Sequence, residues 1–344
     1  MARHPAYPDR ALAALAGMAI GDALGMPSQT LSRADIRARY GQITGFVDPF
    51  PDHPVSHGLR AGQVTDDTEQ ALMLARRLIE GGGSIDEARL AQDLLAWEAD
   101  VKARGLRDLL GPSTKAALDA MLSGAPVSET GRNGTTNGAA MRIAPIGIAT
   151  PLAPLDRFVD QVASACRMTH NTGEAIAAAA AVAAVISAGV GGQDFDTALP
   201  KALQAARAAQ GKGHPTGAPD LADRIEPAVE TAARDSDVAT FAAKIGTSVA
   251  SCESIPAAFG LLRMARGDPW DTVLMAANIG DDTDTIGAIA GAMAGACTGM
   301  AAIPQAALAA VTAANDLPLE TTARDLLSLR HAALDRADAQ EVPT

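Results

Sequence analysis

The sequence predicts an all-α fold, and three observations point to it. Hydrophobic residues make up 48% of the 344 residues but aromatic residues only 3%, so the core has to be built from Ala, Leu, Ile, Val and Met. Sheets draw on aromatic and β-branched residues, whereas small aliphatic residues suit closely packed helices. Helical periodicity dominates the chain, and no alternating strand pattern of any length competes with it.

The expected helices follow one another along the chain, with Pro or Gly near many of their ends. They cover residues 11–24, 66–79, 86–102, 155–167, 172–187, 194–209, 256–265 and 304–315. Segments rich in Gly, Pro and His, at residues 49–62 and 211–220, are expected to be loops. The first of these loops leads directly into Thr65 and is a candidate cover for a site there. Nothing between the ends is typical of a linker, so one large domain is expected over residues 1–344.

A further helix, expected to begin near residue 285, carries a stripe of glycines at a spacing of four. The stripe consists of Gly287, Gly291, Gly295 and Gly299. Each glycine inside a helix costs about 1 kcal/mol relative to alanine, so four in register need a packing reason. A spacing of four places them on one face, where another backbone can approach closely. The stripe therefore predicts a central helix of a tight bundle, with its N-terminus deep in the domain.

Charge and cysteine content limit the partners and the compartment. A net charge of −12 argues against a nucleic-acid or membrane-surface binder, although bound cations could still recruit a small anionic ligand. The three cysteines are far apart, with no CxxC pair, which favours a reducing cytoplasm over a disulfide framework. No targeting segment is evident at the N-terminus. The uncharged runs at residues 175–190 and 286–303 are interpreted as buried helices rather than membrane spans. The sequence leaves the oligomeric state open.

Two short acidic segments, at residues 65–68 and 281–285, are the most informative feature of the chain. Each mixes aspartates with threonines, contains no Lys or Arg, and opens an apolar helical run. Five aspartates gathered in one place would repel one another unless cations lay between them, and hard divalent ions prefer such oxygen ligands. The pair therefore predicts one metal site.

The alternative interpretation is that each segment only begins a helix. Asp and Thr are common N-cap residues, and acidic side chains in the first turn suit the helix dipole. Asp66 followed by Glu69 even fits a capping box. A cap needs a single acceptor, however, whereas these segments offer two and three carboxylates, so a metal site is favoured.

Two other segments are weaker candidates for ligand contacts. Residues 131–142 are rich in Gly, Asn and Thr, and backbone N–H groups without bulky side chains can bind phosphate oxygens, although most such loops are only turns. His170 stands directly before an alanine-rich helix. A histidine there is more often a hydrogen-bonded cap or core residue than a catalytic one.

Taken in order, these motifs resemble the ADP-ribosylglycohydrolase family. Residues 21–27 (GDALGMP) are similar to the family's N-terminal motif, residues 65–68 (TDDT) to its first metal motif, and residues 137–142 (NGAAMR) to its ribose-phosphate loop. Thr169-His170 is similar to its histidine motif, and residues 282–285 (DTDT) to its second metal motif. The match runs from about residue 11 to about residue 329. It implies a compact, single-domain, orthogonal helical bundle with two Mg²⁺ or Mn²⁺ ions that hydrolyses a ribosyl glycosidic bond.

The resemblance also assigns roles by position. It implies that the metal ligands are Thr65, Asp66, Asp67, Asp282, Asp284 and Thr285, and that Asp66, Asp67 and Asp284 carry the catalysis. The expected ligand-binding residues are Gln29, Asn137, Gly138, Ala139, Ala140, Met141, Arg142 and His170. Asp22 is expected to be structural, as a cap or an outer partner. Asp281 falls where many relatives have Gly, and its part stays open.

One departure from the family pattern concerns Gln29, where many relatives have a glutamate that acts on the scissile bond or touches the metal. An amide cannot accept a proton as a general base, so another carboxylate would have to fill that role. Asp66 and Asp67 are the nearest candidates by motif.

The function expected from the resemblance is metal-dependent hydrolysis of ADP-ribosyl conjugates, small or protein-linked, through water activated at a two-metal site. Two alternatives stay open. The first is a hydrolase of smaller nucleoside-like N-ribosides, favoured by Gln29 and by the lack of bulky aromatic residues at 131–142. The second is an ADP-ribose-binding protein without activity, supported only by Gln29.

Overall fold

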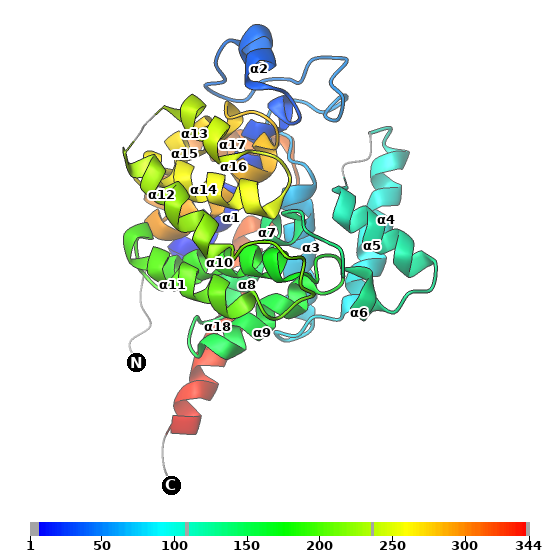
Figure 1. Cartoon of the computed structure of the whole chain (residues 1–344), viewed down its shortest axis with the longest axis vertical. Coiled ribbons are helices and arrows are strands. Elements are labelled where there is room, and N and C mark those ends of the chain that lie inside the picture. Colours follow the sequence, from blue (N-terminus) through cyan, green and yellow to red (C-terminus); the bar gives the residue numbers. More distant parts are fainter. Residues whose placement is uncertain (1–6, 107–109, 235–236, 342–344) are drawn as a thin grey trace.

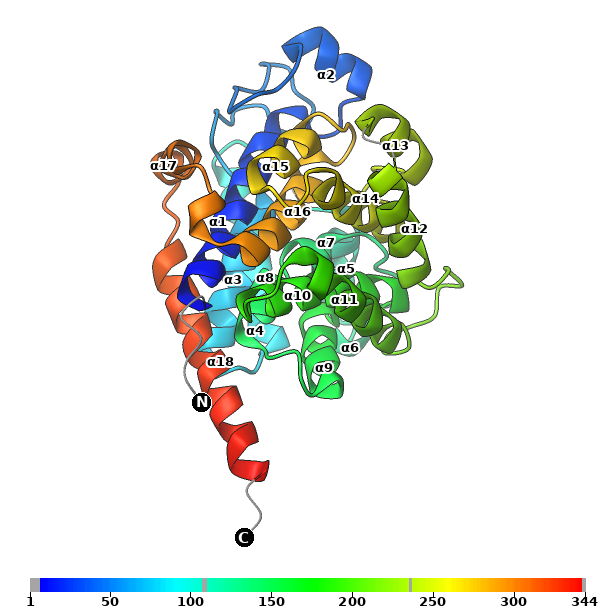
Figure 2. The same ribbon diagram turned by 90° about the vertical axis from the view of Figure 1, so that its left-hand side faces the viewer.

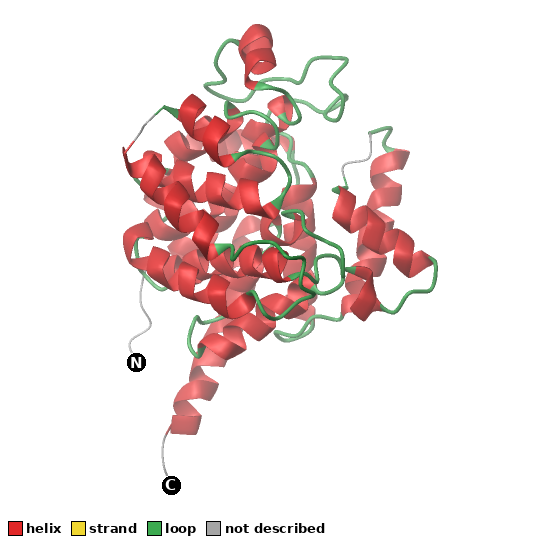
Figure 3. Ribbon diagram, in the orientation of Figure 1, coloured by secondary structure: helices red, strands yellow, loops and turns green. Residues whose placement is uncertain are grey.

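Helices are the regular elements of the protein in the computed structural model, which describes residues 7–106, 110–234 and 237–341 (Figures 1 and 3). The first half contains α1 (Tyr7–Gly25), α2 (Arg33–Tyr40), α3 (Asp66–Glu80), α4 (Glu87–Ala103), α5 (Pro112–Leu122), α6 (Val127–Thr130), α7 (Gly138–Met141), α8 (Ala144–Ala149) and α9 (Leu155–Cys166). The second half contains α10 (Gly173–Val190), α11 (Phe195–Ala209), α12 (Ala222–Arg234), α13 (Val238–Ile245), α14 (Ser251–Met264), α15 (Pro269–Ala277), α16 (Thr283–Thr298), α17 (Gln305–Ala314) and α18 (Leu319–Glu341). Short 3₁₀ turns lie at Met26–Ser28 and Met300–Ala302. In these residues the only β pairing consists of three isolated bridges, so the all-α prediction is confirmed.

Each of the eight predicted segments lies largely within a helix, but α2, α5, α6, α7, α8, α12, α13, α15 and α18 were not predicted. The start of α14 was also predicted five residues late, at Pro256, because proline normally ends helical hydrogen bonding. Proline leaves the carbonyl four residues earlier without its helical partner, and here that carbonyl, of Cys252, accepts from the Arg224 side chain at 3.3 Å. A contact from a distant helix thus compensates for a local signal that would otherwise break α14.

The antiparallel pair of α1 and α16 forms the centre of the fold. A methyl group placed on Gly21 would lie 2.0 Å from the carbonyl oxygen of Gly287, and one on Gly291 would lie 2.1 Å from that of Gly17. The two backbones are therefore in direct contact, and only hydrogen fits at these positions. As predicted, the stripe lines a close helix contact, and the N-terminus of α16 is buried.

The prediction was wrong for the last glycine of the stripe. Gly299 follows the end of α16 and has a φ of +86°, so its backbone conformation, rather than close helix packing, requires glycine there. The expected helix over residues 286–303 correspondingly ends at Thr298 and is followed by a 3₁₀ turn.

Two helices are long and apolar enough to cross a membrane by length and composition, and both lie inside the protein. The windows concerned, in Tyr7–Ser28 and in α10, are 94% and 100% buried. All 18 residues of α10 are buried among its neighbours. This burial agrees with the interpretation of residues 175–190 as a core helix.

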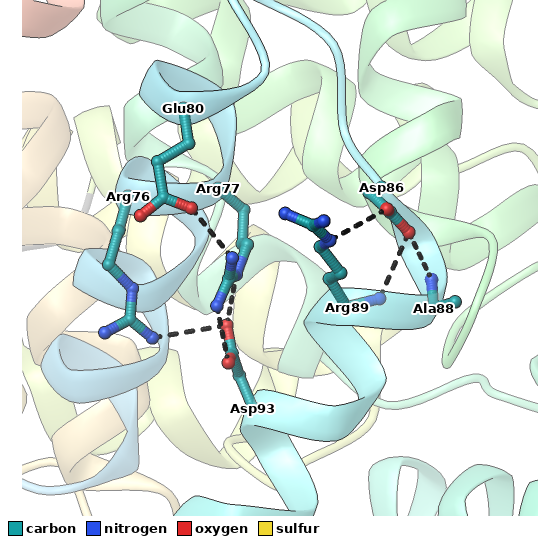
Figure 4. Close-up of polar contacts among 7 residues, drawn as sticks. All are labelled: Arg76, Arg77, Glu80, Asp86, Ala88, Arg89 and Asp93. Carbon is teal, nitrogen blue, oxygen red and sulfur yellow. Dashed lines mark hydrogen bonds and ion pairs between the residues drawn. The ribbon is translucent and has the colours of Figure 1, made fainter.

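Peripheral elements surround this centre. The segment containing α2 and the loop that follows it rises above one end of the α1–α16 pair, while α4 and α5 stand to one side of α3 (Figure 1). The last turns of α18 project from the body, as Figure 2 shows from the side. The contact between α3 and α4 is polar: Arg77 donates to both carboxylate oxygens of Asp93, and Arg76 lies 3.2 Å from the same residue (Figure 4).

Candidate metal and ligand site

The fold brings the two acidic segments to one place, because each lies at a helix N-terminus directed at the same end of α1. Gly25, at the end of α1, lies so close to the first turn of α16 that a methyl group on it would be 2.4 Å from the backbone nitrogen of Asp284. The first turn of α3 is attached to the same end of α1 through Asp22. Segments more than two hundred residues apart thereby share one buried region.

Asp22 is the anchor of this arrangement. Its carboxylate accepts the backbone N–H and the hydroxyl of Thr65, at 3.0 and 2.8 Å, and those of Thr68, at 3.1 and 2.6 Å. Its side chain is fully buried, and burial raises the pKa of Asp22 to about 6. With its oxygens occupied by threonines, Asp22 orients the first acidic segment, in agreement with its predicted structural role.

The remaining aspartates are buried and repel one another. Asp66, Asp67 and Asp284 are 8%, 1% and 3% exposed. Burial, followed by repulsion from neighbouring carboxylates, raises the pKa of each of the three well above its usual value. Burial also raises the pKa of the less buried Asp282 to about 6. None of them forms an ion pair with Lys or Arg among the described residues, so the cluster lacks a protein counter-charge in direct contact.

The interpretation of the segments as helix caps is not supported by the geometry. Thr65 and Asp282 occupy the N-cap positions of α3 and α16, yet neither side chain accepts a capping hydrogen bond. The capping box expected from Asp66 and Glu69 is not formed, because Glu69 instead accepts the indole N–H of Trp97. A true cap is present at the start of α4, where Asp86 accepts from the backbone N–H groups of Ala88 and Arg89 (Figure 4).

The residues fit a divalent cation by donor type. Asp67 Oδ1 is fully buried and has no hydrogen-bond partner in the described chain. Its other oxygen lies 3.2 Å from the Thr65 hydroxyl and 3.4 Å from that of Thr285, so each metal motif brings one hydroxyl to the same carboxylate. Among the described residues, however, no three His, Cys, Asp or Glu side chains are close enough together to hold an ion as they stand. The fit to a cation therefore rests on the carboxylate and hydroxyl donors and on the unpartnered oxygen of Asp67.

Asn137 connects the second metal motif to the ribose-phosphate loop. Its side-chain amide donates to Asp282 Oδ2 at 2.5 Å and to the Ser254 hydroxyl at 3.0 Å. The next residues form the single turn of α7, and the side chains of Ala139, Ala140 and Met141 are buried in the core. Of these four residues, the structure therefore brings only the Asn137 side chain to the aspartates.

His170 and Arg142 lie behind the loop in one buried network. The two ring nitrogens of His170 contact the hydroxyls of Thr169, at 2.7 Å, and Thr136, at 3.0 Å. Burial lowers the pKa of His170 well below its usual value, so the ring is neutral. A methyl group on Gly138 would lie 2.9 Å from His170 Cε1, so the imidazole supports the backbone of the loop.

Arg142 reaches the first metal motif through Gln70. Its guanidinium donates to Gln70 Oε1 at 3.0 Å, and Gln70 Nε2 donates to Asp66 Oδ2 at 3.0 Å. The same guanidinium also donates to the Thr169 hydroxyl. The buried guanidinium of Arg142 thus reaches Asp66 only through the Gln70 side chain.

Gln29 is 9% exposed and is tied to the loop at residues 49–62. Its amide donates to the Ser56 hydroxyl at 3.0 Å, and Ser56 in turn donates to the Met26 carbonyl at 2.7 Å. His53 Nδ1 accepts the backbone N–H groups of Val55 and Ser56, which fixes the turn. The loop expected as a cover is therefore fastened to the end of α1 beside Gln29.

One site element, residues 246–251, was not predicted from the sequence. The Thr247 carbonyl accepts the N–H of Asp282 at 3.0 Å, and the Val249 carbonyl accepts that of Asn137 at 2.9 Å. This segment thus joins the second metal motif to the ribose-phosphate loop. Because these bonds use backbone atoms only, no residue type marks the segment in the sequence.

Asp281, whose role the sequence left open, braces the site from outside. Its φ of +58° is left-handed, its N–H and carbonyl pair with Leu31 and Thr30, and its carboxylate accepts the Thr247 hydroxyl at 2.8 Å. We expect Asp281→Ala to lower the free energy of unfolding by about 2 kcal/mol, half from left-handed strain and half from the lost hydrogen bond. Asp281→Gly should cost less, because glycine tolerates this φ. Urea denaturation of both variants measures the difference, and an equal loss in the two would contradict the strain argument.

The raised pKa values predict how pH and metal affect stability. A carboxyl whose pKa is higher in the folded state than the ordinary 3.8 of an aspartate stabilises the fold at low pH, and this stabilisation is lost as the pH rises through the folded pKa. For Asp22, with a folded pKa of about 6, the loss between about pH 3 and pH 7 is about 3 kcal/mol. In EDTA, we therefore expect these carboxyls to make the protein less stable at pH 8 than at pH 5.

Mg²⁺ should reverse this loss at pH 8, by about 2.7 kcal/mol at a hundred times its dissociation constant. Chemical denaturation at both pH values, with EDTA and with Mg²⁺, measures the effect. Calcium and manganese series would rank the ions. If none of the three ions changed the free energy of unfolding at pH 8, the result would argue against a metal site.

The chain is similar to known proteins in both sequence and structure. A family model described as ADP-ribosylglycohydrolase matches residues 3–336. YegU of Escherichia coli (strain K12), an uncharacterised protein, is 37% identical over 94% of this chain and 97% of its own length. The ADP-ribosylarginine hydrolase Tri1 of Pseudomonas putida (strain GB-1) is 28% identical over 86% of this chain and 72% of its own. A solved structure described as an ADP-ribosylglycohydrolase-related protein complex matches with a TM-score of 0.69 and 26% identity, covering 94% of this chain and 99% of that one.

Proposed function

The chain belongs to the ADP-ribosylglycohydrolase family, and from this premise we propose that it hydrolyses the ribosyl glycosidic bond of ADP-ribosyl conjugates with the help of two Mg²⁺ or Mn²⁺ ions. The observation that carries the proposal is the burial of aspartates from two distant helix N-termini around Asp67 Oδ1, which has no partner in the described chain. Clusters of like charge cost stability, and proteins maintain them mostly where chemistry needs them.

The proposed ion ligands are the side chains of Thr65, Asp66, Asp67, Asp282, Asp284 and Thr285. Ions bound there would supply positive charge for the ribose hydroxyls and would lower the pKa of a nearby water. Two side-chain amides hold ligand oxygens in place, since Gln70 donates to Asp66 and Asn137 donates to Asp282. Asp67 would hold an ion through Oδ2, beside the hydroxyls of Thr65 and Thr285, and its Oδ1, which has no partner in the described chain, would accept a proton from the attacking water.

The cleavage step suits this environment. Departure of the aglycone leaves positive charge on the anomeric carbon and ring oxygen of the ribose, and the carboxylates of Asp66 and Asp284 stabilise that charge. The glycosidic bond breaks with its electron pair going to the aglycone. Asp67 takes one proton from water as the water oxygen bonds to the anomeric carbon, and that proton then passes to the aglycone or to solvent. Gln29 takes no part as a base, because its amide cannot accept the proton and already donates to Ser56.

A smaller N-riboside is the second candidate substrate. It is favoured by the small, buried side chains of Ala139 and Ala140, since no aromatic side chain in residues 131–142 is present to stack against an adenine base. An ADP-ribose-binding protein without activity is the third candidate, and Gln29 is its only support.

Release of ADP-ribose or ribose from a panel running from ADP-ribosyl-arginine to simple nucleosides, with Mg²⁺, Mn²⁺ or EDTA, separates the three. Metal-dependent release from ADP-ribosyl conjugates is the expected result. Faster release from phosphate-free nucleosides would decide for the second candidate. Tight ADP-ribose binding without any hydrolysis would decide for the third.

A further inference from the structure

A groove of about 900 Å³ begins beside the first turn of α3 and runs between α3, α4 and the connection from α17 to α18. At one end it is lined by Gln63 and Val64, which directly precede the first metal motif, and by Glu69, one turn into α3. The groove therefore lies next to the candidate site but contains none of the proposed metal ligands.

Trp97 of α4 lines this groove and is held in a fixed orientation. Its indole N–H donates to the Glu69 carboxylate, and Arg104 lies 3.7 Å from the same carboxylate. Apolar side chains, among them Leu72, Met73 and Leu317, complete the wall. The groove thus combines an oriented aromatic ring with an apolar surface.

The charge along the groove is acidic. Its lining contains six carboxylate residues and two arginines. Five of the six carboxylates are paired with arginines: Glu69 and Asp100 with Arg104, Asp93 with Arg76, Glu80 with Arg77, and Asp325 with Arg324 (Figure 4 shows the pairs of Asp93 and Glu80). Asp316, in contrast, is exposed and has no side-chain partner in the described chain. An aromatic ring among carboxylates is a favourable environment for a guanidinium or ammonium group on an apolar stem.

We propose that this groove docks a basic segment of the protein that carries the ADP-ribosyl group, while the modified residue occupies the aspartate site. The inference rests on the proposed function. It adds that the preferred substrates are protein-linked and rich in Arg or Lys near the modification. The contacts would involve Trp97, Asp100 and Asp316, and the catalytic residues would take no part in them.

Binding can be measured without any turnover, because the chain has only two tryptophans, Trp97 and Trp270. In a Trp270→Phe background, a short peptide of alternating Arg and Ala should change the emission of Trp97, and a Glu-Ala peptide should not. Reversing two groove charges, Asp100→Lys with Asp316→Lys, should weaken binding about tenfold, and about 0.5 M salt should act in the same direction.

The control reverses a matched pair of exposed carboxylates elsewhere, Asp156→Lys with Glu230→Lys. Glu230, like Asp100, pairs with an arginine four residues away, and Asp156, like Asp316, has no side-chain partner in the described chain. The control should leave the dissociation constant within about twofold. Unchanged Trp97 emission, or equal weakening by both pairs, would overturn the proposal.

Activity gives an independent readout. Trp97→Ala should lower kcat/KM for an ADP-ribosylated protein about tenfold and leave that for free ADP-ribosyl-arginine unchanged. Equal losses on the two substrates would overturn docking, because the residue would then act on the site itself. If the parent protein hydrolyses neither substrate, the proposed function fails, and the fluorescence measurement still decides whether the groove binds basic peptides.

Discussion

Asp67→Asn is expected to abolish turnover while the fold survives. The substitution keeps the size of the side chain and one acceptor for the hydroxyls of Thr65 and Thr285, but it removes a negative charge and the proton acceptor at Oδ1. Loss of one group that stabilises transition-state charge costs about 10²–10³-fold in kcat, and here a base is lost as well. We therefore expect a decrease at or above the upper end of that range.

The same substitution should stabilise the metal-free protein at pH 8, because the folded protein then no longer buries a charge that Asp284, Asp22 and Asp282 repel. Activity and stability are thus expected to change in opposite directions. Mg²⁺ titration, urea denaturation and ribose release on the same preparation measure all three quantities. An active, metal-replete Asp67→Asn protein would remove Asp67 from the mechanism.

Asp86→Asn provides a matched control. Asp86 is an aspartate that truly caps a helix, and asparagine caps about as well as aspartate. The control should leave turnover and metal affinity unchanged. If both substitutions had the same small effect, Asp67 would have no role beyond its place in the first turn of α3.

The sequence was sufficient to predict the fold class and the meeting of the two acidic segments. Composition and periodicity are local properties, and the aspartates of both segments are exceptional in number and lack basic neighbours. The glycine stripe predicted the close contact of α16, but the partner helix α1 was not identified, although its own Gly17, Gly21 and Gly25 are also spaced by four and the first two meet the stripe. Gly299 shows the limit of the pattern, because a helix end and a helix interior both accept glycine for different reasons.

Other site features depend on contacts that leave no mark in the sequence. The segment at residues 246–251 contacts Asp282 and Asn137 through backbone carbonyls, and the Gln29–Ser56 bond joins two segments whose register the sequence does not specify. Ala139 and Ala140 were expected at the ligand, yet their side chains belong to the core, so only the backbone there is available for a ligand contact. Whether each predicted residue binds metal or substrate stays a prediction.

Gly291→Ala is expected to cause a large loss of stability from a single added methyl group. That methyl would lie 2.1 Å from the Gly17 carbonyl oxygen and 3.0 Å from a Val273 methyl group, and a backbone carbonyl within a helix cannot rotate away. Alanine gains about 1 kcal/mol in helix propensity, but overpacking against backbone costs more. A net loss of about 3 kcal/mol or more is expected by urea denaturation.

Loosening the contact between α1 and α16 should also weaken metal binding, and this links the packing of the two helices to function. Asp22 on α1 and Asp284 on α16 lie at the same end of the helix pair, and Gly291 lies near the middle of α16. Separating the two helices therefore moves one acidic segment away from the other. Gly291→Ala should therefore lower Mg²⁺ affinity in the fraction that stays folded. Gly211→Ala is the matched control, because a methyl group there meets nothing within 4 Å, and its effect should stay within about 0.5 kcal/mol. Unchanged metal affinity in folded Gly291→Ala would mean that the aspartates hold their places independently of the α1–α16 contact.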